Sequence, residues 1–190
     1  MYKYVVKPSD LKIIQDLINL SKKAYELGLT IGRSGNISGR IRDNIIIIKK
    51  TGRSLNKLKP KDFVITDLLS DDVPNNVSSD YLIHREIYLS NPKIRYILHV
   101  HPAKLIKLTL STKETKIIPQ TYEGKIYFGN EIPIVREEHD NLHRILKKYI
   151  NDINKRFLIE AGHGVYVYSY NPDEILPILE ELEYIASLSL

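Results

Sequence analysis

Hydrophobic and polar positions follow two different periods along the chain. Between residues 8 and 28, apolar side chains recur every three or four positions, which predicts a helix with one buried face that starts near Pro8 and stops at Gly28. The same spacing predicts helices over 78–89, 102–110, 140–153 and 172–188. Short runs rich in Ile and Val predict strands over 36–41, 45–49, 63–66, 94–101, 157–160 and 165–168. The turn at 42–44 joins the first two strands into a hairpin.

This order of elements predicts an α/β fold. We expect a single domain over residues 1–190, an αβα sandwich around a central, largely antiparallel mixed sheet. A chain of this length buries a full hydrophobic core without a covalent staple. Residues 115–136 carry a weaker pattern and predict only strand and loop.

Composition narrows the chemistry. The sequence has no Cys, which excludes a disulfide scaffold, a thiolate nucleophile, a zinc finger and an iron–sulfur cluster. Any metal ion must therefore bind His, carboxylate or backbone oxygen. The net charge of +5 comes from Lys and Arg spread along the whole chain, so it favours a small phosphorylated substrate over nucleic acid.

The sequence also bears on location. Its start lacks the long apolar stretch of a signal peptide, and its longest aliphatic run, 45–48, is far too short to span a bilayer. We expect a cytoplasmic protein without membrane contact.

Three histidines are candidate metal ligands. His99 and His101 lie two positions apart on a predicted strand, so their side chains share one face. His163 lies between two glycines that permit close backbone approach. Three imidazoles around one divalent ion, with an open coordination position, are typical of a catalytic site. The alternative is that the first two are ordinary strand histidines and the third a turn histidine.

The other histidines have plainer interpretations. His139 and His143 lie one turn apart on a polar helix, beside several acidic residues, and we expect both to face solvent. His84 lies inside the helix predicted over 78–89, where we expect it to pack or to support the site from behind.

Three short loops offer backbone amides and hydroxyl groups. Taken singly, each is an ordinary turn or helix cap, but together they would form a phosphate cradle. Asp80 follows the third loop in the first turn of a helix, where a carboxylate is usually a capping residue. Close to the histidines, it would become a candidate base or fourth metal ligand. The loop residues are Gly35, Asn36, Thr51, Gly52, Ser78 and Ser79.

The order of these motifs resembles the class II aldolase/adducin-head superfamily. Ser-Gly-Asn-Ile-Ser, Thr-Gly-Arg-Ser, Ser-Ser-Asp, His-Val-His-Pro and Gly-His-Gly follow one another between about residues 28 and 167. The resemblance implies that His99, His101 and His163 hold a divalent ion, usually zinc. It also implies that the loop residues listed above bind the substrate phosphate.

Two further roles are implied by the resemblance. Asp80 falls where the aldolases carry a catalytic Glu and where the epimerases carry an Asp that ligates the metal. Tyr122 resembles the aldolase tyrosine that protonates the aldehyde oxygen from a neighbouring subunit. The segment after His163 is nearly all taken up by the last predicted helix, so it has no evident counterpart of the tail tyrosine of the epimerases.

The family therefore implies a metal-dependent aldolase that cleaves a ketose 1-phosphate, similar to fuculose 1-phosphate, into glycerone phosphate and an aldehyde. It also implies a homotetramer. The same scaffold carries two alternatives, a pentulose-5-phosphate 4-epimerase and a methylthioribulose-phosphate dehydratase. A fourth interpretation is a non-catalytic interaction domain like the adducin heads, although those lack the metal histidines.

Overall fold

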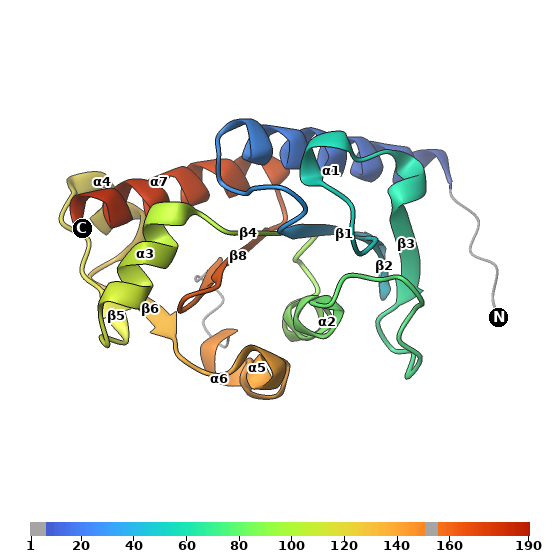
Figure 1. Ribbon diagram of the computed structural model, residues 1–190. Coiled ribbons are helices and arrows are strands. Elements are labelled where there is room, and N and C mark those ends of the chain that lie inside the picture. The colour runs from blue at the N-terminus through green and yellow to red at the C-terminus, as the bar shows by residue number, and fades with distance from the viewer. Residues whose placement is uncertain (1–6, 151–155) are drawn as a thin grey trace.

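The computed structural model describes residues 7–150 and 156–190. An eight-stranded sheet runs through its centre in the order β3-β2-β1-β4-β8-β7-β6-β5. Figure 1 shows α1 and α7 across one face of this sheet, with α2, α5 and α6 across the other. The predicted αβα sandwich is confirmed.

One half of the sheet is formed by the strands that the sequence predicted most clearly. β1 (Asn36–Arg42) and β2 (Ile45–Lys49) form the expected antiparallel hairpin. β3 (Phe63–Asp67) continues the sheet beyond β2, while β4 (Tyr96–Val100) pairs with the other side of β1. β8 (Gly164–Ser169) then pairs with β4, so distant parts of the chain meet at the centre of the sheet.

The other half completes a mixed sheet. β7 (Phe157–Glu160) pairs antiparallel with β8 and parallel with β6 (Ile132–Val135). β5 (Lys116–Ile117) pairs antiparallel with β6. Among the strands that the structure describes, only β6 and β7 pair in parallel, which agrees with the predicted largely antiparallel sheet.

The helical layer over the first face rests on an aliphatic core. It comprises α1 (Pro8–Glu26), α3 (Ala103–Ser111), α4 (Tyr122–Phe128) and α7 (Ile175–Leu188). The stop predicted for the first helix is confirmed, because Gly28 adopts φ +73° just beyond α1. None of the described helices is both long enough and apolar enough to cross a membrane.

The layer over the second face holds α2 (Tyr81–Ser90), α5 (His139–Ile145) and α6 (Lys147–Ile150). The single helix predicted over 140–153 is wrong in detail, since two short helices replace it and residues 151–153 lie outside the described part of the chain. Three one-turn 3₁₀ helices lie in connecting segments, at Leu55–Lys57, Pro60–Asp62 and Pro172–Glu174.

Candidate active site

Strand register brings the candidate residues to one end of the sheet. His99 on β4 pairs with Asn36, the first residue of β1, and on its other side with Tyr166 of β8. His163 lies in the tight turn between β7 and β8, where its N–H donates to the carbonyl of Glu160 at 3.2 Å. A glycine is required at position 164, because a Cβ there would lie 2.3 Å from the carbonyl oxygen of Val100.

The three histidines proposed from the sequence meet through one nitrogen each. The Nε2 atom of His99 lies 2.8 Å from Nε2 of His101 and 3.3 Å from Nε2 of His163. Ligand nitrogens of a tetrahedral zinc site lie about 3.3–3.4 Å apart when each Zn–N bond is about 2.0–2.1 Å. The separation of His99 and His163 matches this spacing, the separation of His99 and His101 is shorter, and all three nitrogens lie within 4.8 Å of one another.

Hydrogen bonds orient these rings toward their shared focus. Nδ1 of His99 donates to the carbonyl of Val165 at 3.1 Å, and Nδ1 of His163 lies 3.0 Å from a carboxylate oxygen of Glu160. In a neutral ring, each of these bonds leaves Nε2 as the unprotonated atom. Burial lowers the pKa of His99 well below its usual value and also lowers the pKa of His101. Neutral imidazoles with converging lone pairs are a suitable donor set for a divalent cation.

Asp80 lies beside this cluster, directly before α2. Asn36 donates its amide N–H to Oδ2 of Asp80, and Ser79 donates its hydroxyl to Oδ1 at 3.1 Å. Oδ2 also lies 3.6 Å from Nε2 of His99. Burial alone would raise the pKa of Asp80, but the hydrogen bond with His139 and the neighbouring imidazoles lower it overall. Asp80 is therefore an ionised carboxylate within reach of both an ion and a substrate.

His139 contradicts the expectation that it faces solvent. Its Nε2 lies 3.4 Å from Oδ1 of Asp80, and its Nδ1 lies 3.0 Å from Oε1 of Glu160. The reason is the packing of α5, which begins at His139, against the end of β7, where Glu160 lies. The hydrogen bond with Asp80 is the main cause that raises the pKa of His139 to about 9, against the opposing effect of burial.

Sequence reasoning also missed Glu160 and Tyr166. Glu160 is only 3% exposed and contacts both His139 and His163. Its signal was a carboxylate at the end of an otherwise apolar strand. Tyr166 stacks on the ring of His99, with centroids 4.0 Å apart and planes 14° from parallel. As one of 13 tyrosines in the sequence, Tyr166 gave no distinguishing signal.

The three loops line one small cavity of about 200 Å³ together with the histidines. All six predicted cradle residues line it: Gly35, Asn36, Thr51, Gly52, Ser78 and Ser79. Gly35 approaches the site closely, since a Cβ at its φ of +78° would lie 2.6 Å from the carbonyl oxygen of His99. The side chains of Asn36 and Ser79 already hold Asp80, which leaves backbone amides and the remaining hydroxyls to face a ligand.

Basic side chains also reach this cavity. Arg33 and Lys49 are among its lining residues, and neither was predicted from the sequence as a site residue. The ammonium group of Lys49 donates to the carbonyl of Arg53 at 2.8 Å. Burial lowers the pKa of Lys49 to about 8. Their positive charge favours an anionic ligand.

Three residues considered in the sequence analysis do not line the cavity. Tyr122, the first residue of α4, is 75% exposed. His84 is fully buried, as its expected packing role requires, with Nδ1 2.7 Å from Oγ of Ser38. His143 is partly exposed on α5. None of the three contacts the ligand cavity directly.

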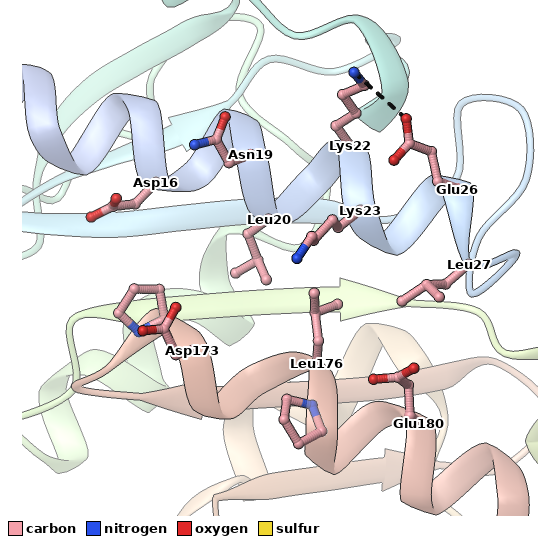
Figure 2. Close-up of a pocket in the computed structure, with 12 residues that line it drawn as sticks. Asp16, Asn19, Leu20, Lys22, Lys23, Glu26, Leu27, Asp173, Leu176 and Glu180 are labelled. Carbon is pink, nitrogen blue, oxygen red and sulfur yellow. Dashed lines mark ion pairs between the residues drawn. The ribbon is translucent and has the colours of Figure 1, made fainter.

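A larger hollow of about 870 Å³ lies between α1 and α7. Figure 2 shows Leu20 and Leu176 facing each other across it, with charged side chains such as Lys23 and Glu180 around its rim. No histidine is among its lining residues in the described part of the chain. Of these two cavities, the smaller one is lined by the candidate metal ligands His99, His101 and His163.

The model of the family described as "Class II Aldolase and Adducin N-terminal domain" matches residues 15–190. The chain is 31% identical to a 3-oxo-tetronate 4-phosphate decarboxylase of Haemophilus influenzae, over 95% of this chain and 88% of that protein. It is 26% identical to a methylthioribulose-1-phosphate dehydratase of Gluconobacter oxydans, over 93% of this chain and 90% of that protein.

A solved structure agrees with the fold. The L-fuculose-1-phosphate aldolase of Thermus thermophilus superposes with a TM-score of 0.81, covering 94% of this chain and 93% of that one at 20% identity. At this identity the likeness establishes a shared architecture.

Proposed function

Since the chain belongs to the class II aldolase and adducin N-terminal domain family, we propose that it is a metal-dependent lyase acting on a small sugar phosphate. Its reaction is aldol cleavage of a ketose 1-phosphate to glycerone phosphate and an aldehyde. The observation that carries the proposal is the convergence of three Nε2 atoms beside the buried carboxylate of Asp80.

His99, His101 and His163 would hold the divalent ion, with zinc the best match to three imidazole ligands. When bound, the ion supplies Lewis acidity that polarises a carbonyl oxygen and stabilises the negative charge of an enediolate. Glu160 holds the ring of His163 in the tautomer that presents Nε2.

The loops around the cavity hold the substrate phosphate. Backbone amides at Gly35 and Gly52, with the hydroxyls of Thr51 and Ser78, present donors from three segments. The start of α2 adds its dipole to these donors. Fixing the unreactive end of the substrate aligns its reacting carbon with Asp80.

Asp80 moves the proton. Asn36 and Ser79 hold its carboxylate beside the cluster, where it would take a proton from a carbon of glycerone phosphate in the synthetic direction. In the cleavage direction the carboxyl group, once protonated from solvent, would give a proton to the enediolate carbon. The carboxylate is buried yet ionised, so it is ready to accept a proton at neutral pH.

The aldehyde oxygen needs a second proton-transferring group. We propose that residues 1–190 form one domain and assemble as a homotetramer, in which Tyr122 reaches the cavity of a neighbouring subunit. The exposed position of Tyr122 at the start of α4 leaves it accessible to such a neighbour.

Decarboxylation of a 3-oxo sugar-acid phosphate is the second candidate, favoured by the relative at 31% identity. Loss of CO₂ from such an acid leaves the same enediolate of glycerone phosphate as aldol cleavage does. It requires no group for an aldehyde oxygen, which agrees with the position of Tyr122 outside the cavity lining. The dehydratase relatives suggest a third reaction, in which water leaves without carbon–carbon cleavage.

One set of assays separates these reactions. The zinc-loaded protein is incubated with fuculose 1-phosphate, 3-oxo-tetronate 4-phosphate or methylthioribulose 1-phosphate, and glycerone phosphate is followed with a coupled NADH-dependent reductase. We expect release from the first substrate that stops when a chelator removes the metal. Release only from the second would favour the decarboxylase, and water elimination from the third would favour the dehydratase. Metal-independent release would refute the proposal, and no turnover of any substrate would favour an interaction domain.

A further inference from the structure

His139 connects two parts of the site that the motifs leave separate. Its two ring nitrogens contact Asp80, which precedes α2, and Glu160, which ends β7. Its ring also lies 4.4 Å from the ring of His163, measured between centroids.

The two carboxylates need such a partner. Asp80 is 5% exposed and Glu160 is 3% exposed, so each has lost most of its hydration. Burying a carboxylate is costly unless it is paired and hydrogen-bonded. Asn36 and Ser79 provide neutral donors to Asp80, and His163 provides one N–H to Glu160. His139 adds a side chain that lies within 3.4 Å of Asp80 and 3.0 Å of Glu160.

The two contacts have separate consequences. At Asp80, His139 contacts Oδ1 and so opposes a rotation of the carboxylate that would bring both oxygens to a bound ion. Oδ2 stays beside His99 and the rest of the histidine cluster. At Glu160, the contact on Oε1 leaves Oε2 facing Nδ1 of His163. One side chain therefore fixes both the proton-transferring carboxylate and the carboxylate that orients a ligand.

We infer that His139 is a positioning residue that braces Asp80 against Glu160, and so couples the geometry of the acid–base group to that of the metal ligand His163. The inference rests on the proposed function for the role of Asp80. Its effect on His163 needs only a metal ion in the cluster.

The test compares His139→Leu and His139→Gln with His143→Leu, a matched change one turn further along α5 that lies outside the cavity lining. Cobalt(II) is titrated into the metal-free proteins, and its visible absorption reports the ligand geometry. Loss of an outer carboxylate–histidine partner typically weakens metal binding by about 10–100-fold. We expect that weakening and a changed spectrum for His139→Leu, a smaller change for His139→Gln, and none for His143→Leu.

A second experiment measures proton transfer by Asp80. It follows by NMR the rate at which a carbon-bound proton of glycerone phosphate exchanges with deuterium at saturating metal. We expect His139→Leu to lower kcat about 10-fold or more while KM changes less than about 3-fold. His139→Gln keeps a polar side chain of similar size, and it provides the test if the Leu variant does not fold. Wild-type cobalt affinity, spectrum and exchange rate in the folded variants would overturn the inference. If the variants change cobalt binding but the wild type has no lyase or exchange activity, the positioning role of His139 is supported and the proposed function is refuted.

Discussion

The two faces of the sheet bury different kinds of side chain. Under α1 and α7 the core is almost purely aliphatic, with Leu17 and Leu179 fully buried. Under α2, α5 and α6 the core holds tyrosines and a buried polar cluster. There the hydroxyl of Ser38 lies 2.7 Å from Nδ1 of His84 and 2.9 Å from the hydroxyl of Tyr88.

The two faces therefore differ in how far they stabilise the fold and how far they position the side chains of the site. Aliphatic contacts are non-directional, so the first face stabilises the sheet without fixing any one side chain precisely. Hydrogen bonds are directional, and the polar cluster lies on β1 and α2, the two elements that carry Asn36 and flank Asp80. We conclude that the first face mainly supports the fold, and that the second face also aligns the site.

The largest expected effect comes from the site itself. Asp80→Asn keeps the size of the side chain and its acceptor oxygen but removes the proton acceptor, so kcat for glycerone phosphate release should fall about 10²–10⁴-fold. Steady-state kinetics and metal analysis of the same sample check this. Retained metal with lost turnover identifies Asp80 as the acid–base group, whereas loss of the metal would identify it as a ligand.

A cavity in the aliphatic face should lower stability without changing the chemistry. Leu17→Ala removes a fully buried side chain of α1 and should cost about 2–5 kcal/mol of unfolding free energy. Urea denaturation measures this loss, and kcat per folded molecule should match the wild type. A variant with near-normal stability but reduced kcat would contradict the separation of the two faces.

A change in the polar face should affect both properties. Ser38→Ala leaves Nδ1 of His84 and the hydroxyl of Tyr88 without this partner, at a cost of about 1–3 kcal/mol. Because Ser38 lies two residues from Asn36 on β1, we also expect a measurable fall in kcat. Denaturation and kinetics on one preparation check both effects, and an unchanged kcat would restrict this cluster to a structural role.

The smallest effect is expected at the opposite end of β8. Burial alone would raise the pKa of Glu174, but hydrogen bonds from Ser169 and Arg156 lower it overall. A lowered pKa in the folded state means that this group stabilises the protein above its unfolded pKa of about 4.3 and loses that contribution on further acidification. The pair with Arg156 is partly exposed, so its contribution should stay below about 1 kcal/mol.

Glu174→Gln should therefore reduce stability slightly at neutral pH and weaken its decline between about pH 5 and pH 3. Thermal denaturation across this range measures both changes. Cobalt binding provides the control, since a change this far from the histidines should leave it unaltered. An equal loss of stability at pH 3 and pH 7 would contradict the assigned role of Glu174.

The sequence predicted much of this fold because its signals are local. The hairpin of β1 and β2 and the stop at Gly28 follow from short-range patterns. The nearness of His99 and His101 follows in the same way, although β4 ends at Val100 and His101 lies just beyond the strand. His163 was found through its flanking glycines. These features needed no knowledge of which strands pair across the sheet.

The errors at the site have a common cause. The neighbours of His139 along the chain are polar, which indicated a solvated face, but the docking of α5 over β7 decides where its ring points. Glu160 was hidden in the same way, because only the parallel pairing of β6 with β7 and the tight turn to β8 bury its carboxylate beside two histidines. Long-range packing set both positions.

Metal analysis tests the central claim most directly. The wild-type protein and the His163→Ala variant are each equilibrated with excess zinc, dialysed, and assayed by mass spectrometry for metal content per chain. We predict one tightly held divalent ion in the wild type and a large loss in the variant, with both proteins folded by circular dichroism. Equal metal content in the two folded proteins, or none in either, would contradict the account.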